Sequence, residues 1–196
     1  MTFWGEIAPC DHVVQIYEDD NTFLDTLTGY VGSGINAGDC VVIIATSVHL
    51  RSLETRLDAC GIPLESLKSE DRYIPLDAEE TLAKFMINNW PDDNLFGATI
   101  TSILQRAQDR NRTIRAFGEM VALLWAQGHQ GATVRLETLW NEFIAKNPMP
   151  LFCAYPKSGF TQDINTSIDH ICSSHTKMIR SSPNHPTQEI QYKSVR

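Results

Sequence analysis

Side chains that could bind or react follow several short apolar runs of this chain. They are Tyr17, Glu18, Asp19 and Asp20 after the first run, then Thr46, Ser47 and His49, then Asp77, then Phe117, Gly118 and Glu119, and last Tyr155 and Pro156. If the runs are parallel strands, these residues meet at the carboxyl edge of one sheet, where ligands of open α/β proteins usually bind. The sequence therefore predicts a ligand site at this edge, drawn from Tyr17, Glu18, Thr46, His49, Arg115 and Glu119.

The segment after the first run does not suit a nucleotide. Nucleotide-binding α/β proteins place a glycine-rich loop with Lys and Ser/Thr there, whose backbone N–H groups hold phosphates. This chain has EDDNT (18–22) instead, with three consecutive carboxylates. Carboxylates at a helix N-terminus satisfy its dipole themselves and repel a triphosphate. Asp20 or Asn21 either caps the next helix or contacts a ligand, and in both cases the segment disfavours ATP at this site.

Arg115 and Glu119 bracket the end of the fourth predicted strand. An arginine inside an apolar strand needs a carboxylate or a ligand anion, because an unpaired buried charge is too costly. The two alternatives are a buried ion pair, with Glu119, Glu18 or Glu137 as the partner, and direct contact with a ligand. Glu119 also stands where ATPases of this architecture keep a catalytic carboxylate.

No metal, cofactor or catalytic motif is expected. His170, Cys172 and His175 form H-x-C-x-x-H, but only Cys172 and His175 share a helical face, and a structural zinc site needs four ligands. The alternative to a metal site is that these three residues lie on an ordinary half-buried helix face. Cys153 lies in an apolar run, which raises the pKa of a thiol and makes it a poor nucleophile.

Strands and helices are expected to alternate along the chain. Apolar, β-branched runs predict strands at 12–18, 39–46, 72–78, 112–118 and 150–156, the third near an edge because of Pro75. Helical spacing predicts helices at 21–35, 47–61, 79–89, 94–109, 119–128, 132–147 and 162–179. This order is typical of an α/β fold with a mostly parallel sheet of about five or more strands and helices on both faces.

Composition sets the class of protein and its surroundings. Apolar residues make up 42% and charged residues 20%, as in a soluble globular domain, and the net charge of −8 disfavours nucleic acid. No run reaches the roughly 20 apolar residues of a membrane helix, and the N-terminus is unlike a signal peptide. Five scattered cysteines without CxxC spacing indicate a reducing compartment. We expect a cytoplasmic protein with an N-terminal arm (1–11), one domain (12–180) and a polar tail (181–196).

Several segments resemble one known family. HVVQIYED, GDCVVIIATSVHLRSLETRL, IRAFGEMVALLWAQG, LETLWNEF, LFCAYP and a closing IC-x-x-H are similar, in order from about His12 to His175, to the methanogen/methylotroph sensory (MEDS) domain. The most specific part is R-x-FGEMV-x-LLW followed by LE-x-LWN and CAYP. The resemblance implies a three-layer fold like that of KaiC and RecA, with the phosphate loop lost.

The same resemblance implies an input domain of signalling proteins. Relatives are fused to DNA-binding regulators of one-carbon and halocarbon metabolism or to histidine kinases, and are thought to sense small organic molecules. This chain departs from that pattern, because no helix-turn-helix and no kinase ATP lid is found in its 196 residues. It is expected to report to a signalling partner, such as a histidine kinase or transcription regulator, or through its own assembly.

Three functions follow as alternatives. The first is a non-catalytic sensor that binds a small organic ligand or a partner at the strand edge. The second is a degenerate ATPase core kept for protein contacts, and the third is an enzyme that uses Glu119, either a residual nucleotide hydrolase or a transferase. A homodimer is also expected, through Phe3, Trp4 and Ile7 or through the apolar stripe Ile168, Ile171, Cys172 and Ile179; the alternative is that both segments cover their own domain.

Overall fold

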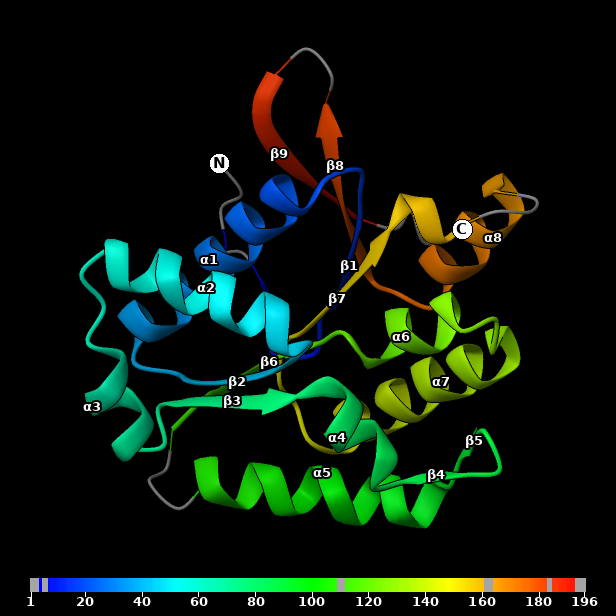
Figure 1. Ribbon diagram of the computed structural model, residues 1–196, viewed down its shortest axis with the longest axis horizontal. Coiled ribbons are helices and arrows are strands. Elements are labelled where there is room, and N and C mark those ends of the chain that lie inside the picture. Colours follow the sequence, from blue (N-terminus) through cyan, green and yellow to red (C-terminus); the bar gives the residue numbers. More distant parts are fainter. Residues whose placement is uncertain (1–3, 5–6, 109–111, 161–163, 183–184, 193–196) are drawn as a thin grey trace.

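A seven-stranded sheet lies between helices in the computed structural model (Figure 1), which describes residues 4, 7–108, 112–160, 164–182 and 185–192. The strand order is β3-β2-β6-β7-β1-β8-β9. All pairs are parallel except β8 with β9. The strands are β1 (His12–Tyr17), β2 (Cys40–Ala45), β3 (Tyr73–Asp77), β6 (Ile114–Gly118), β7 (Leu151–Pro156), β8 (Lys177–Ser182) and β9 (His185–Tyr192). The predicted α/β fold with a mostly parallel sheet is confirmed.

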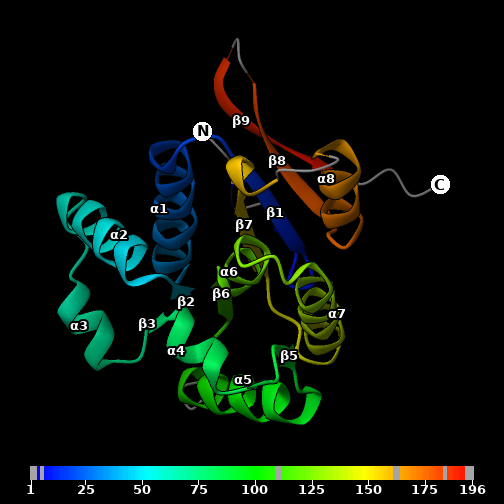
Figure 2. The ribbon, with the colours of Figure 1, turned by 45° about the vertical axis from the view of Figure 1, so that its right-hand side comes forward.

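Helices cover both faces of the parallel part of the sheet, and the hairpin of β8 and β9 extends beyond them (Figure 2). One face packs against α1 (Asp20–Ala37), α2 (Ser47–Ala59) and α3 (Leu64–Ser69). The other packs against α4 (Ala78–Ala83), α5 (Asp93–Gln108), α6 (Met120–Ala126), α7 (Gln130–Lys146) and α8 (Ile164–Ser173). This explains the continuous apolar runs, because strands covered on both sides have no solvent face for polar residues. Every residue of β2 is buried, and β3 is an edge strand as predicted.

The helix predicted at 79–89 is too long. The structure ends α4 at Ala83 and forms a short hairpin from β4 (Met86–Ile87) and β5 (Trp90–Pro91). Asn88 and Asn89 have φ values of 51° and 61°, and asparagine is one of the few residues that adopts this left-handed backbone readily. Two such residues make the turn that suits a two-residue hairpin.

The C-terminal prediction also needs correction. The helix expected at 162–179 is confined to α8, and the segment expected as a tail, 181–196, contributes the end of β8 and all of β9. Lys177, Met178 and Ile179 pair with Val13, Val14 and Gln15 of β1, so the chain returns to the sheet after α8. Residues 161–163, 183–184 and 193–196 lie outside the described part.

The described side chains of both surfaces suggested for a homodimer pack, wholly or partly, against the core of their own chain. Trp4 is buried, with its ring 4.9 Å from that of Tyr30 and 5.6 Å from that of Phe152. Ile7 packs partly against the same core, while Phe3 lies outside the described residues. The four members of the predicted stripe on and after α8, Ile168, Ile171, Cys172 and Ile179, likewise contact the core of the chain. Association stays a prediction: Trp4, Ile171 and Ile179 are buried within the chain, whereas Ile168 and Cys172 are half-buried.

Arg115 forms a buried ion pair, as one of the two alternatives predicted, but with a different partner. Its Nε and Nη2 donate to Asp39 Oδ2 at 3.1 and 2.9 Å, and its Nη1 donates to the carbonyl of Tyr30 at 3.3 Å. The partner is Asp39 and not one of the three expected carboxylates, Glu119, Glu18 and Glu137. The reason is that Arg115 is the second residue of β6 and lies at the amino end of the strands. Gly34 of α1 leaves the space for the guanidinium, since a Cβ there would stand 2.9 Å from Arg115 Nε.

Arg115→Met is predicted to reduce the free energy of unfolding by about 3–5 kcal/mol, because it leaves Asp39 buried without its counter-ion. Arg115→Met combined with Asp39→Asn should recover most of that loss. Urea denaturation measures all three proteins.

The control is Arg106→Met. Arg106 pairs with Asp71 at 2.7 Å, but these side chains are 53% and 36% exposed, so the change should cost about 1 kcal/mol or less. Equal effects of Arg115→Met and Arg106→Met would contradict the assignment of a buried pair.

Candidate functional site

Glu119 joins the end of β6 to the start of α2. Its Oε2 accepts from the backbone N–H of Thr46 at 2.8 Å, and its Oε1 lies 2.7 Å from Nδ1 of His49. Thr46 caps α2 and accepts from the backbone N–H of His49 at 3.3 Å. Both carboxylate oxygens therefore bind groups of one helix terminus, and neither is left without a hydrogen-bond partner.

The pair of His49 and Glu119 is only slightly open to solvent. The side chains are 13% and 7% exposed. Burial works to lower the pKa of His49, but the hydrogen bond to Glu119 and the charges of Glu119 and Asp20 outweigh it, so the pKa is raised. The imidazole therefore holds a proton more tightly than a free histidine does.

Aromatic rings close one side of this pair. Tyr17, at the end of β1, stacks on Phe23 of α1 with centroids 4.6 Å apart, and Phe23 meets the ring of His49 edge-on at 5.0 Å. Burial, and next the charges of Glu119 and Asp20, raise the pKa of the Tyr17 hydroxyl. Tyr17 therefore stays neutral and belongs to the same small group as His49 and Glu119.

The acidic segment after β1 has three separate roles. Glu18 forms an exposed ion pair with Lys157 at 2.5 Å. Asp19 caps α1 by accepting a hydrogen bond from the backbone N–H of Thr22 at 2.9 Å. The helix cap is therefore Asp19, and not Asp20 or Asn21 as the sequence predicted. Asp20 is exposed and lies 4.0 Å from Nε2 of His49. These carboxylates stand where a phosphate loop would place its donors.

Four of the six predicted site residues come together. Tyr17, Thr46, His49 and Glu119 form one cluster, hereafter the strand-edge site. Glu18 lies beside it but turns to Lys157, and Arg115 lies at the opposite end of β6, paired with Asp39. Arg115 was predicted at the carboxyl edge of the sheet, but it lies three residues before the end of β6 and therefore near the amino end of that strand.

A second polar group is buried on the other face of the sheet. It consists of His12 of β1, Glu137 of α7, Cys153 of β7 and His175, which follows α8. Their ligand-type atoms all lie within 4.8 Å of one another. We call these four residues the buried cluster. Burial, with a contribution from His175, lowers the pKa of His12 to about 3, and burial raises the pKa of Glu137 and of Cys153.

The sequence held only weak signs of the buried cluster. The sequence pattern groups His175 with His170 and Cys172, but in the structure His175 faces residues from two strands and another helix. Among these, Cys172 is half-buried on the core, and the side chain of His170 lies outside the described part. The usable signal was Glu137 between the apolar residues Leu136 and Leu139 of α7, because a carboxylate on a buried stripe needs partners.

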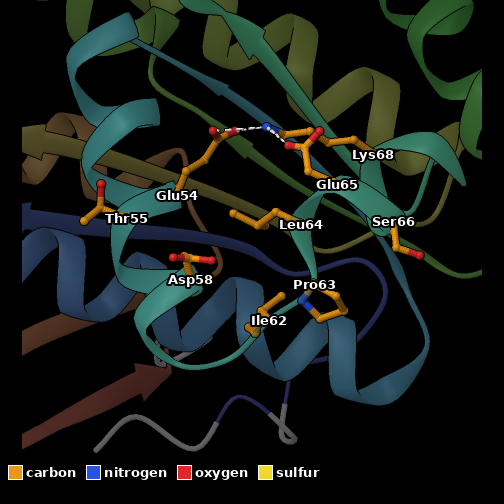
Figure 3. Close-up of a pocket in the computed structure, with 9 residues that line it drawn as sticks. All are labelled: Glu54, Thr55, Asp58, Ile62, Pro63, Leu64, Glu65, Ser66 and Lys68. Carbon is orange, nitrogen blue, oxygen red and sulfur yellow. Dashed lines mark hydrogen bonds and ion pairs between the residues drawn. The ribbon is translucent and has the colours of Figure 1, made fainter.

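A shallow hollow lies at the surface between α2 and α3 (Figure 3). Ile62, Pro63 and Leu64 are among its lining residues, and Lys68 forms ion pairs with Glu54 at 3.1 Å and with Glu65 at 3.4 Å. The hollow includes none of the strand-edge residues, and these ion pairs occupy much of its polar lining.

These features define an α/β core of the KaiC type in which a carboxylate segment replaces the phosphate loop. Among solved structures, the chain is similar to the KaiC-like protein PH0186 from Pyrococcus horikoshii, with a TM-score of 0.59, 9% identity and coverage of 95% of this chain and 80% of that one. This likeness shows the fold. No curated protein sequence matches the chain.

Residues 11–176 match the MEDS family, the methanogen/methylotroph, DcmR sensory domain. The chain therefore belongs to this family of sensory domains, as the resemblance implied. Among the residues that the structure describes, no helix is long and apolar enough to cross a membrane.

Glu119→Gln is predicted to lower the pKa of His49, because the variant keeps a hydrogen-bond acceptor and removes the charge. NMR titration of the His49 ring resonances measures the change. A His49 pKa that is unaffected by Glu119→Gln would contradict the ion pair.

The raised pKa also fixes the sign of a stability effect. A group with a raised pKa in the folded state stabilises it fully below its unfolded pKa, here about 6.5, and loses that contribution as pH rises through the folded value. The loss of stability in His49→Gln should therefore be largest below about pH 6.5 and shrink at higher pH. His129→Gln, at a half-buried position before α7, is the control and should not reproduce this trend.

Proposed function

We propose that this chain is a non-catalytic sensing domain that binds a small organic ligand at the strand-edge site and reports it through protein contacts. Membership of a sensory family supports the sensing role. The single observation that carries the choice of site is the engagement of both Glu119 oxygens by the N-terminus of α2.

This arrangement disfavours catalysis by Glu119. A general base must accept a proton from a substrate or water, and here the backbone of Thr46 and the ring of His49 hold the carboxylate. A residual nucleotide hydrolase would also need phosphate donors, and the loop after β1 offers Glu18, Asp19 and Asp20 instead. Both observations favour binding over turnover.

The same contacts suggest how binding could be reported. A ligand with a hydrogen-bonding group near His49 competes with the bond that fixes the first turn of α2 to β6. Because α2 has an exposed side that includes Arg51, Thr55 and Asp58, a small shift of this helix changes a face that a partner can read. A signalling protein, such as a histidine kinase or a transcription regulator, or a second copy of the chain is the proposed partner.

Mg-ATP and Mg-GTP are predicted not to bind appreciably, because three carboxylates stand where phosphate donors are required. Titration calorimetry should show no dissociation constant below about 0.1 mM, equivalent to about −5.5 kcal/mol. A tighter value would favour the residual hydrolase.

Small one-carbon and halocarbon compounds are the first probes to test, since the family resemblance points to them. Methanol, methylamine and dichloromethane are added separately to ¹⁵N-labelled protein. At least one should shift the amide resonances of Thr46, His49 and Glu119 in a saturable way, and His49→Gln should weaken that response while His129→Gln preserves it.

Two results would count against this proposal. If saturable changes of the amide resonances are confined to other regions and are unchanged in His49→Gln, the ligand binds elsewhere than at the strand-edge site. No saturable shift with any probe would favour the alternative of an interaction module that works without a ligand.

A further inference from the structure

We propose that His12, Glu137, Cys153 and His175 form a buried site for one tetrahedrally coordinated transition-metal ion, with Zn²⁺ as the best match. The four residues offer two imidazole nitrogens, one carboxylate oxygen and one sulfur, a donor set that zinc accepts. This inference goes beyond the sensing function and does not depend on it, because the buried cluster and the strand-edge site share no residue.

The distances between donor atoms suit a single ion. His12 Nε2 lies 3.3 Å from Cys153 Sγ and 3.4 Å from Glu137 Oε2, and His175 Nε2 lies 3.5 Å from Glu137 Oε1. Metal–ligand bonds of about 2.0–2.3 Å at tetrahedral angles separate neighbouring donors by about 3.3–3.8 Å. Small side-chain movements would therefore complete the coordination.

Both histidine rings present the same nitrogen to the centre of the cluster. Nδ1 of His12 is 2.9 Å from Oδ1 of Asn141, and Nδ1 of His175 is 2.7 Å from the carbonyl of Ile171. Because both partners accept hydrogen bonds, each Nδ1 carries the proton, and each Nε2 keeps a lone pair directed inward. Metal-binding histidines are held in this way by acceptors behind them.

Hydrogen bonds from the residues around the cluster also hold its side chains in the orientation that metal binding needs. Asn141 donates its amide to the carbonyl of Ser174 at 2.9 Å, which leaves its oxygen for His12. The hydroxyl of Tyr155 donates to Glu137 Oε1. Glu137 Oε2 has no hydrogen bond in the described part of the chain, although it is fully buried, and a buried acceptor without a donor needs an explanation. A cation at the centre of the cluster would supply one.

Charge balance favours a divalent ion at this depth. The four residues are 0–3% exposed, so a net charge among them would be costly. A thiolate, a carboxylate and two neutral imidazoles carry −2, which a divalent ion cancels. Binding forms the metal–sulfur bond as the thiol loses its proton to solvent, and a coordinating thiol is deprotonated outright.

The site would fasten together parts of the chain that are distant in sequence. His12 and Cys153 lie on neighbouring strands β1 and β7, Glu137 lies on α7, and His175 lies between α8 and β8. Four protein ligands leave no open position, which is typical of a structural site. The ion would therefore hold α7 and the C-terminal segment on the sheet.

Cobalt(II) is the probe, because it replaces zinc and its absorption reports geometry and ligands. The tag-free chain carrying Cys10→Ser and Cys60→Ser, which removes the two exposed thiols, is unfolded under reducing conditions and refolded with Co²⁺, since a buried site is loaded during folding. We expect one ion per chain, the intense visible bands of tetrahedral Co²⁺, a near-ultraviolet thiolate-to-cobalt band, and displacement by one equivalent of Zn²⁺.

Matched variants locate the ion. Cys153→Ser should remove the thiolate-to-cobalt band, whereas Cys40→Ser, at another buried thiol, should keep it. Asn141→Ala, which removes the acceptor behind His12, should weaken Co²⁺ binding about 10–100-fold. Circular dichroism checks that each variant is folded.

The proposal is overturned if the folded parent chain shows neither tetrahedral bands nor a stoichiometric ion after refolding with Co²⁺ or Zn²⁺. It is equally overturned if the spectrum is unchanged by Cys153→Ser, or if Cys40→Ser alone abolishes it. The first result would make the buried cluster a hydrogen-bonding network only, and the others would place the ion elsewhere.

Discussion

Burial of the parallel sheet on both faces is the constraint on which the rest of this structure depends. Helices exclude water from either side, so each polar side chain that enters the sheet must find its partner inside the protein. Arg115 does so with Asp39 at the amino end of the strands, and Glu119 does so with His49 at the carboxyl end. The buried cluster obeys the same rule on the opposite face, between the sheet, α7 and α8.

The strand edge of this KaiC-like fold differs from a nucleotide site in the residues that it presents. The loop after β1 carries carboxylates in place of a glycine-rich phosphate loop, and the carboxylate of Glu119 after β6 binds the N-terminus of α2. This contact positions the first turn of α2 relative to β6. Under the proposed function, a ligand that alters this contact would change the outer surface of the protein without any reaction.

Much of the fold was predictable, because strands that are buried on both faces consist of continuous apolar runs, which the sequence shows directly. The strand-edge residues followed from the same logic, since parallel strands bring their ends together. Partners across the sheet were not predictable: Asp39 and Arg115 are 76 positions apart, and His12 and Cys153 are 141 apart. The hairpin of β8 and β9 was missed because its polar sequence lacks the apolar run of a central strand.

Native mass spectrometry of the chain purified from its own host tests the central claim, that this is a sensor for a small organic ligand with no use for nucleotides. The account predicts a small organic molecule retained at a fixed ratio per chain, lost from His49→Gln but kept in His129→Gln, and no bound nucleotide. A stoichiometric nucleoside di- or triphosphate on the wild-type chain would contradict it.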